Sequence, residues 1–401
     1  MGLTPGYKQT EVGVIPEEWR VAKIKDVASI TTGKRNTQDR IEDGQYPFFV
    51  RSQIVERINS YSFDGEAVLT AGDGVGTGKV FHYINGKFDF HQRVYKLSDF
   101  SADLNGFYFY LYFSNHFYDR IMSMTAKSSV DSVRLETIAG MLIPLPPPSE
   151  QRAIAGALSD VDALISAQDK LIAKKRDLKQ AAMQQLLTGK QRLPGFQGEW
   201  EVKRLGDVAD VDPDNLGSST APDYEFKYIS LEDVDAGVLR SYSEQVFRSA
   251  PSRARRKLQK GDILVSTVRP NLKSHLLFAI NAPHWVCSTG FAVVRCNENV
   301  THPGYLFYQL FGHGVSKQIE ALLTGSNYPA INSGDVRALR ILFPTLNEQT
   351  AIASVLSDMD AELAALEQRR DKTRALKQGM MQELLTGRTR LPLDEGTPCV
   401  A

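Results

Sequence analysis

A helical passage occurs twice in this chain and constrains its fold more than any other feature. The first copy begins at Glu150 as EQRAIAGALSDVDALI, and the second begins at Glu348 as EQTAIASVLSDMDAEL. The copies also close alike, with LKQAAMQQLLTGKQRLP and LKQGMMQELLTGRTRLP. A spacing of about 198 residues that holds without a gap indicates one structural unit used twice. A chain with two equivalent halves usually meets a partner that also has two halves.

Length and charge set the first limits on function. The chain of 401 residues is long enough for two domains with separate cores. Lysine plus arginine and aspartate plus glutamate number 47 each, so the formal net charge is zero. A neutral chain is not expected to coat nucleic acid indiscriminately, although this balance does not exclude local basic surfaces.

Targeting signals and cysteine pairs are absent from the sequence. We find no signal peptide at the N-terminus and no run of about 20 apolar residues that could cross a bilayer. The three cysteines form no CxxC pair and predict no disulfide framework. A cytoplasmic location is therefore expected.

The repeat divides the chain into two mixed segments, each followed by a long helix. Short β-rich runs and an aromatic helix in each mixed segment predict the same α+β topology twice. The expected fold class is α+β, with two homologous α+β domains separated by two long antiparallel helices that form a coiled coil and give approximate twofold internal symmetry. The expected bounds are 1–148 for the first domain, 149–190 for the first long helix, 191–346 for the second domain, 347–390 for the second long helix and 391–401 for the tail.

Apolar residues inside the long helices alternate between spacings of four and three, which is typical of a coiled-coil seam. At 1.5 Å per residue, about 38 helical residues span roughly 57 Å, too long for a core helix of either small domain. We therefore expect the two helices to pair with each other; two ordinary amphipathic domain helices are the alternative. The predicted seam consists of Leu158, Val161, Ile165 and Ile172 in the first helix and Leu356, Met359, Leu363 and Leu366 in the second.

Local signals place further elements in the mixed segments. The pair Asn85-Gly86 lies inside KVFHYINGKFDFHQRVYKL and predicts a hairpin turn. Aromatic helices are expected from Gly106 and from Gly304, again about 198 residues apart. The openings EEWRVAKIKDVASI and GEWEVKRLGDVADV also match; if the end of the second long helix lies near residue 10, the molecule closes into a ring with approximate twofold symmetry.

Catalytic motifs are missing. The glycine cluster AGDGVGTGK at 71–79 fails as a phosphate loop, because Asp73 replaces a required glycine and Val80 replaces the required serine or threonine. A tight loop beside a hairpin is the better interpretation, and such loops can approach a DNA backbone closely. The scattered histidines and cysteines predict no metal site, and the run PDYEFK at 222–227 is discounted as an acidic nuclease triad. The chain is expected to catalyse nothing.

Basic clusters remain as candidate binding residues. Residues 248–273 carry about eight cations and one acid, a strong local imbalance. Cations there suit phosphates, while Arg and Asn after a strand can reach base edges; a solvated surface charge is the alternative for each residue. The candidates in the first half are Lys34, Arg35, Arg40, Arg51, Gln53, Lys79, Gln92, Arg93, Lys127 and Ser128. Those in the second half are Arg253, Arg255, Arg256, Lys257, Lys260, Arg269, Asn271, Lys273, Asn327 and Tyr328.

These features together resemble a known family. Two variable α+β segments, each followed by a long helix entered through P-x-x-x-E-Q and left through LLTG-x-x-RLP, resemble the specificity subunit of type I restriction-modification systems. The GVIPEEW opening and its GFQGEWEVKRLGDVADV echo are similar to that family as well. The similarity covers essentially the whole chain, although the centres of the globular parts are not specific to the family.

The resemblance implies a division of labour. Each globular part would be a target recognition domain for one half of a split sequence in double-stranded DNA, and the paired helices would act as a ruler. Two modification subunits that bind S-adenosylmethionine and methylate adenine, and restriction subunits with ATP-driven translocation, would be the partners; no membrane is implied. S-adenosylmethionine, ATP and Mg are expected on those partners, and no cofactor or metal is expected in this chain. An outer stripe of Leu164, Leu171 and Leu178 is a candidate docking surface.

Two alternatives were considered. A protein-only scaffold would use the coiled coil and the globular ends to bind other proteins. An enzyme, either a methyltransferase or a nuclease, would need a site that the motifs do not reveal.

Overall fold

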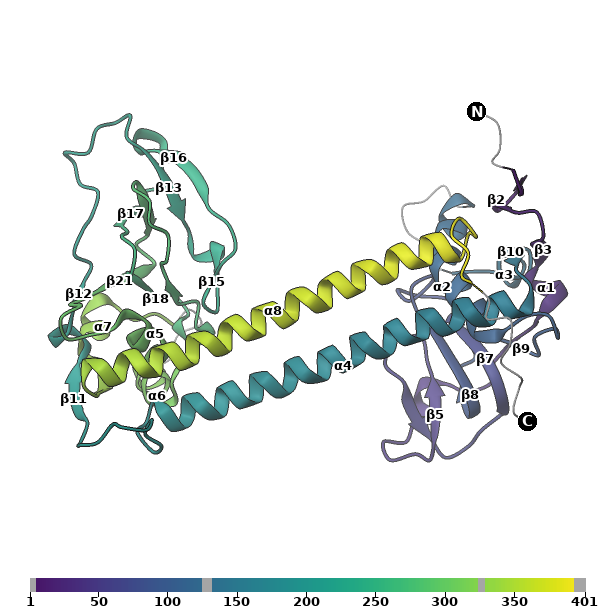
Figure 1. Cartoon of the computed structure of the whole chain (residues 1–401), viewed down its shortest axis with the longest axis horizontal. Coiled ribbons are helices and arrows are strands. Elements are labelled where there is room, and N and C mark those ends of the chain that lie inside the picture. The colour runs from purple at the N-terminus through teal and green to yellow at the C-terminus, as the bar shows by residue number, and fades with distance from the viewer. Residues whose placement is uncertain (1–4, 125–131, 324–328, 393–401) are drawn as a thin grey trace. The chain divides into compact units, whose positions relative to one another are not determined.

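A computed structural model of the chain describes residues 5–124, 132–323 and 329–392 (Figure 1). The contacts within the chain divide it into unit 1, Met1–Asp169 with Arg369–Ala401, and unit 2, Lys170–Gln368. Two helices of 39 residues, α4 (Pro148–Leu186) and α8 (Leu346–Leu384), each contribute one half to unit 1 and the other half to unit 2. The sequence placed these helices at 149–190 and 347–390, so both begin one residue earlier and end several residues earlier than expected.

Unit 1 is built on one twisted sheet with short flanking elements. Its elements are β1 (Tyr7–Thr10), β2 (Gly13–Pro16), β3 (Arg20–Lys23), α1 (Ile24–Val27), β4 (Ser29–Thr32), η1 (Thr37–Asp39), β5 (Tyr46–Phe49), β6 (Glu56–Ile58), β7 (Phe63–Ala71), β8 (Phe81–Phe90), β9 (Val94–Ser98), α2 (Gly106–Ser123), α3 (Leu135–Ala139) and β10 (Leu142–Leu145). The sheet has the order β4-β9-β7-β8-β5-β6, and only β5 and β8 pair in parallel. Helix α2 lies against this sheet (Figure 1), where Phe113 and Phe117 pack on Phe81 of β8.

Unit 2 contains two four-stranded sheets. Its elements are β11 (Glu201–Arg204), η2 (Leu205–Asp207), β12 (Ala209–Val211), β13 (Glu225–Ile229), η3 (Leu231–Asp233), β14 (Val234–Asp235), β15 (Val238–Leu239), β16 (Ser243–Val246), η4 (Phe247–Ser249), β17 (Ala254–Lys257), β18 (Ile263–Ser266), η5 (Pro270–Leu272), β19 (Leu276–Leu277), β20 (Trp285–Ser288), β21 (Phe291–Cys296), α5 (Pro303–Phe311), α6 (His313–Leu322), α7 (Ser333–Ala338) and β22 (Arg340–Phe343). One sheet has the order β12-β21-β18-β19 and the other β16-β13-β20-β17.

The two units repeat one topology. The antiparallel order β12-β21-β18-β19 in unit 2 corresponds to β4-β9-β7-β8 in unit 1. A further sheet pair also corresponds, since β3 pairs with β10 in unit 1 as β11 pairs with β22 in unit 2. The predicted α+β class and the internal duplication are therefore confirmed.

Two local expectations were wrong. Asn85 and Gly86 do not form a turn: β8 runs straight through them, paired with Glu66 and Gly65 of β7, and the turn between these strands lies at residues 72–80 instead. The long strand β7 offers backbone partners along this whole stretch, which outweighs the local turn preference. The expected aromatic helix from Gly304 is also broken, because Gly312 adopts an extended conformation between α5 and α6.

Ion pairs across α4 and α8 show that the helices run antiparallel. In unit 1, Asp162 pairs with Lys377 at 2.7 Å and Asp169 pairs with Arg374 at 2.9 Å. The counterparts about 198 residues away make the same pairs in unit 2, as Asp360 with Lys179 and Glu367 with Arg176. The duplication therefore carries its own set of cross-helix pairs, and the predicted antiparallel pairing is confirmed.

Burial follows the predicted seam. Leu158, Ile172 and Leu356 are at most 2% exposed, and the other five predicted seam residues are partly buried. Near the middle the seam becomes polar, since Gln168 donates a hydrogen bond to Thr373 at 3.2 Å within unit 1. Apolar burial is complete at Leu158 and Leu356, near the globular parts, and Ile172 retains it next to the polar position.

A buried ion pair joins both long helices to the globular part of unit 1. Glu150, in the first turn of α4, is 1% exposed. It accepts a hydrogen bond from Trp19 Nε1 at 3.0 Å and two from Arg390, each at 2.9 Å. The hydrogen bonds between Arg390 and Glu150 raise the pKa of the Arg390 guanidinium above its ordinary value. Tyr7 also donates to the carbonyl of Gly387 at 3.0 Å, so the segment after α8 lies against the N-terminal strands.

Unit 2 contains the same junction. Glu348, in the first turn of α8 and 1% exposed, accepts hydrogen bonds from Trp200 at 3.1 Å and from Arg192 Nη2 at 2.6 Å. In each unit the next residue, Gln151 or Gln349, is fully buried and bonded to backbone groups. The repeated motifs P-x-x-x-E-Q, EW and LLTG-x-x-RLP thus meet in one place per unit.

The junction in unit 1 predicts a specific loss of stability. Replacing Arg390 by Ala leaves the Glu150 carboxylate buried without its cation, and we expect the free energy of unfolding to fall by about 3 kcal/mol. Arg388→Ala is the matched control, because the Arg388 side chain is 68% exposed. Thermal denaturation of the full chain measures both. Equal midpoints for the two variants would contradict a stabilising role for the junction.

Candidate nucleic-acid interface

The fold of unit 1 brings together candidates that lie far apart in the sequence. The segment after β4 lies beside the segment after β8. Arg35 forms a bridge with His91, and the Arg35 carbonyl accepts a hydrogen bond from Gln92 N at 2.8 Å. The Gln92 amide also donates to Asn36, a residue that the sequence did not single out. Lys34, next in the chain, is exposed at the same edge.

Asp73 connects two further candidates at this edge. Its carboxylate binds Arg51 at 2.9 Å and lies 3.5 Å from Arg93. Asp73 belongs to the glycine cluster, which the structure places between β7 and β8, so a strand follows the loop and no helix does. This arrangement agrees with rejecting a phosphate loop, since such a loop requires a helix N-terminus. Gln53 and Lys79 are exposed on the neighbouring segments.

Arg35 has a structural role as well. Its guanidinium binds Asp89 at 3.1 Å and Ser60 at 3.0 Å, and the Asp89 side chain is only 2% exposed. A buried carboxylate needs such a partner. Arg35 therefore holds the end of β8, and any contact of Arg35 with nucleic acid must use the exposed part of the guanidinium.

In unit 2 the basic strand that follows Arg253 lies close to the loop that begins at Thr267. Arg253 precedes β17, and its carbonyl accepts from Thr289 N at 2.8 Å. The next residue, Gly290, accepts from both the backbone N and the hydroxyl of Thr267. Thr267 begins the loop that carries Arg269, Asn271 and Lys273. One turn thus connects the basic strand to this loop.

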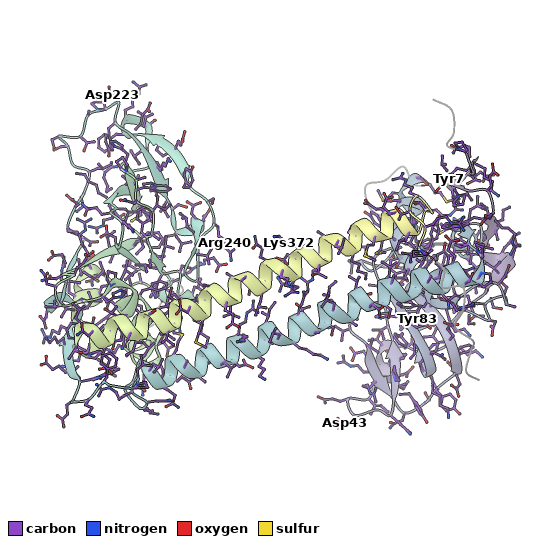
Figure 2. The ribbon with its side chains drawn as sticks, in the orientation of Figure 1. Tyr7, Asp43, Tyr83, Asp223, Arg240 and Lys372 are labelled. Atoms are coloured by element: carbon purple, nitrogen blue, oxygen red, sulfur yellow. The ribbon has the colours of Figure 1, made fainter. Side chains whose placement is uncertain are left out.

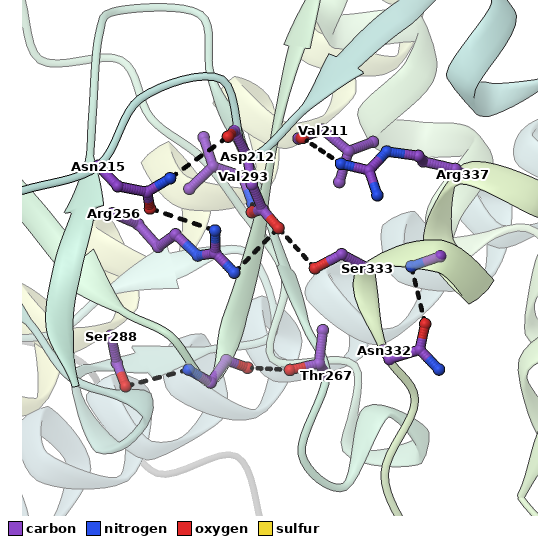
Figure 3. Close-up of polar contacts among 12 residues, drawn as sticks. Val211, Asp212, Asn215, Arg256, Thr267, Ser288, Val293, Asn332, Ser333 and Arg337 are labelled. Atoms are coloured by element: carbon purple, nitrogen blue, oxygen red, sulfur yellow. Dashed lines mark hydrogen bonds and ion pairs between the residues drawn. The ribbon is translucent and has the colours of Figure 1, made fainter. Parts of the chain in front are cut away.

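Arg256 is part of a buried polar network around Asp212 (Figure 3). The Asp212 side chain, 7% exposed, accepts from Arg256 at 2.9 Å and from Val293 N at 2.9 Å, and also binds the Ser333 hydroxyl. Arg256 reaches Asn215 with its other terminal nitrogen at 3.2 Å. The network joins four segments of unit 2, so the structure gives Arg256 a role in holding the fold.

Folding also reduces the charge imbalance seen in residues 248–273. Two aspartates from outside that run approach it. Asp212 pairs with Arg256, and Asp214 comes within 4.0 Å of Lys257. Arg255 donates to the Ala254 carbonyl and lies over the Phe247 ring at 4.9 Å. Arg253 and Lys260 are exposed and are the better candidates for phosphate contacts. No sequence signal marked the aspartates, because they approach only through tertiary contacts.

Four predicted DNA-binding residues lie in segments that the structure does not describe. Lys127, Ser128, Asn327 and Tyr328 lie outside the described residues, and every DNA contact proposed from the sequence stays a prediction. Asp223 of the run PDYEFK lies exposed at an outer tip of unit 2 (Figure 2), while Lys227 of the same run lies over the Trp285 ring at 5.4 Å. Within 5–124, 132–323 and 329–392, no three His, Cys, Asp or Glu side chains gather as metal ligands, and no helix is long and apolar enough to span a membrane.

Comparison with known protein families gives a consistent result. The family model described as type I restriction modification DNA specificity domain matches residues 16–174 and again residues 197–374. The MjaVIII specificity subunit of a type I restriction enzyme from Methanocaldococcus jannaschii is 25% identical over 408 residues, covering 94% of each chain. The EcoDI specificity subunit from Escherichia coli is 22% identical and covers 93% of this chain and 88% of its own. The resemblance noted from the sequence is confirmed.

Solved structures share the fold. The S subunit of a type I restriction-modification system from M. genitalium superposes with a TM-score of 0.61 at 16% identity, covering 95% of this chain and 99% of its own. A chain from a study of complex assembly in a type I R-M system gives a TM-score of 0.54 at 18% identity, with coverages of 94% and 99%. These similarities support the duplicated α+β architecture described above.

The Asp212 network predicts that Arg256 and Arg253 differ in their effect on stability. Arg256→Ala leaves a buried carboxylate without its cation, and we expect a loss of about 2 to 3 kcal/mol in the free energy of unfolding. Arg253→Ala, at an exposed site, should change it by less than about 0.5 kcal/mol. Adding Asp212→Asn to Arg256→Ala removes the unpaired charge and should restore part of the loss, as read by denaturant titration. A double variant no more stable than Arg256→Ala would contradict this interpretation.

Proposed function

Because the chain belongs to the family of type I restriction modification DNA specificity domains, we propose that each of its two units reads one half of a split DNA sequence. The named relatives are specificity subunits, which are the non-catalytic DNA-recognition subunits of their complexes. The expectation that this chain is not itself an enzyme is confirmed by that membership, which also places it in an assembly with other subunits. Membership favours DNA reading over the protein-only scaffold.

One observation carries the proposal of two readers. The loop between β7 and β8 in unit 1 and the loop between β18 and β19 in unit 2 occupy the same place in one repeated topology. Each loop adjoins a group of exposed cations, yet the loop sequences AGDGVGTGK and TVRPNLKSH differ completely. A common scaffold with different basic loops is what two readers of different half-sites require.

The long helices support a spacer role. Each is 39 residues long, or about 58 Å, and each is continuous from one unit into the other. Two half-sites separated by a fixed length of duplex need such a connection, since half-sites about one helical turn apart present the same face of DNA. Linking the readers also makes the second contact intramolecular and raises the overall affinity.

We assign the chemistry to partner subunits. Two modification subunits would bind S-adenosylmethionine and methylate adenine in each half-site, and restriction subunits would supply ATP-driven translocation with Mg. This chain would then bind no cofactor and no metal of its own. The stripe of Leu164, Leu171 and Leu178, 47%, 41% and 47% exposed, supports a docking role, because three heptad-spaced leucines remain outside the seam.

The proposal predicts sequence-specific binding with a steep salt dependence. Sequencing the methylated bases of a host that carries the full system should yield one bipartite motif. The chain with its modification subunits should bind a duplex with that motif more tightly than a scrambled duplex, and affinity should fall strongly as salt rises, because phosphate contacts release counterions. Arg253→Ala and Lys260→Ala should each lower affinity and flatten the salt slope by about one unit.

Lys317→Ala, an exposed lysine in α6, serves as the control for these variants and should leave both quantities unchanged. Equal affinity for the motif and scrambled duplexes would contradict the proposed function. Turnover of DNA or S-adenosylmethionine by the pure chain would contradict the assignment of chemistry to its partners.

A further inference from the structure

The loops between β7 and β8 and between β18 and β19 are fastened at the same point. In unit 1, Val133 N donates to the Gly72 carbonyl at 2.8 Å, and Asp73 forms a bridge with Ser132. In unit 2, Ile331 N donates to the Thr267 carbonyl at 2.9 Å, and Val268 forms a bridge with Ala330. The two loops are therefore structural equivalents although their sequences share nothing.

Each loop presents one large apolar side chain to solvent. Val75 is 98% exposed in unit 1, and Leu272 is 61% exposed in unit 2. Ile54, on the adjoining segment of unit 1, is 73% exposed. A single exposed apolar residue is ordinary on a protein surface, but the same feature at equivalent loops of both units is not accounted for by the fold.

The loop of unit 1 is held rigidly beneath Val75. Gly74 has φ +77° and its carbonyl accepts from both the backbone N and the hydroxyl of Thr77, which is 3% exposed. Gly76 is so close to the Arg51 carbonyl that a Cβ there would lie 2.5 Å from that oxygen. Only a glycine fits at such a contact, so the chain is shaped to hold Val75 outward.

The loop of unit 2 reaches the same result with strained backbone. Arg269 and Lys273, which flank the turn Pro270–Leu272, have φ +50° and +54°, a region that non-glycine residues rarely adopt. His275 closes the loop: it is 1% exposed, its Nδ1 accepts from Ser266 N at 3.1 Å, and burial lowers its pKa to about 4. Such strain persists where the surroundings impose it and is concentrated at functional sites.

Two cations lie near each apolar tip. Arg51 and Arg93 share the single carboxylate of Asp73 beside Val75. Arg269 and Lys273 flank the turn that carries Leu272, and Lys273 Nζ lies 3.5 Å from the Phe311 carbonyl. An apolar tip with cationic flanks suits a groove whose walls are phosphates and whose floor offers an apolar group. In the major groove of duplex DNA that group is the C5 methyl of thymine.

We propose that Val75 and Leu272 each contact the C5 methyl group of a thymine in the major groove, one in each half-site. This inference rests on the proposed function, because it names a base contact of each reader. The two loops, at 72–80 and 267–275, have nine residues each, and loops of this length can enter a groove about 12 Å wide. Insertion between base pairs is the competing mode, but valine is not among the usual wedge residues, and a methyl contact explains both tips.

The test removes the methyl group from the DNA. Thymines of the methylated motif are replaced one at a time by deoxyuridine, and the chain with its modification subunits is titrated at fixed salt. The wild-type chain should lose about fourfold in affinity at one thymine in each half-site, the value expected for one buried methyl group. Val75→Ser should abolish this loss in one half-site only, and Leu272→Ser in the other. Val202→Ser, at a site 61% exposed like Leu272, should retain both losses.

The outcomes separate this inference from the proposed function. Failure of the wild-type chain to prefer the motif over a scrambled duplex would overturn the proposed function itself. Tolerance of deoxyuridine at every thymine, with the preference intact, would overturn the methyl contact alone. Three results with Val75→Ser would also overturn the methyl contact. These are a retained sensitivity to deoxyuridine, a smaller bend of the bound DNA, and a failure to assemble with the modification subunits.

Discussion

The buried pairing of a glutamate with an arginine and a tryptophan is the interaction on which the rest of each unit depends. Glu150 and Glu348 stand in the first turn of their helices, where the helix dipole favours a negative charge. Each is taken out of water, so each needs cationic and N–H partners to compensate its desolvation. Those partners come from the opening of the globular part and from the segment after the other long helix. Glu150 therefore fixes three separate segments in unit 1, and Glu348 fixes the start of α8 to the connection after α4 in unit 2.

This constraint explains which parts of the duplicated sequence remain alike. The glutamate, the tryptophan and the arginine recur together, because losing either donor weakens the compensation of the buried carboxylate and losing the carboxylate deprives both donors of their acceptor. The glycines that end the helices are bound to the same place: Gly189 has φ +68° and lies against Trp200, while Gly387 has φ +70° and lies against Pro16 and Trp19. The readers are free to differ because nothing in the junction depends on their loops.

The sequence predicted the periodic and duplicated features well, because helix seams and repeats are written locally. The pairing of α4 and α8 follows from heptad spacing, and their antiparallel direction follows from the different globular segments that they leave; the ion pair of Asp162 with Lys377 agrees with both. Contacts between residues far apart in the chain could not be predicted from the sequence. Pairing with the long strand β7 outweighed the turn preference of Asn85-Gly86. Arg256 forms an ion pair with Asp212, which is distant in the sequence. The candidate site was therefore predicted as a region but not as a set of contacts.

The division between junction and loops also has an energetic consequence. Stability in each unit comes from buried groups: the glutamate pair, the helix seam and the core beneath the sheets. The loops at Val75 and Leu272 lie on top of this core and add little apolar burial of their own, while their shape is imposed by glycines, strained residues and hydrogen bonds from below. A change of side chain at such a tip costs the fold almost nothing, since the side chain is already in water. The same change alters whatever the tip contacts. A scaffold of this kind can acquire a new DNA target by single substitutions without first losing its fold.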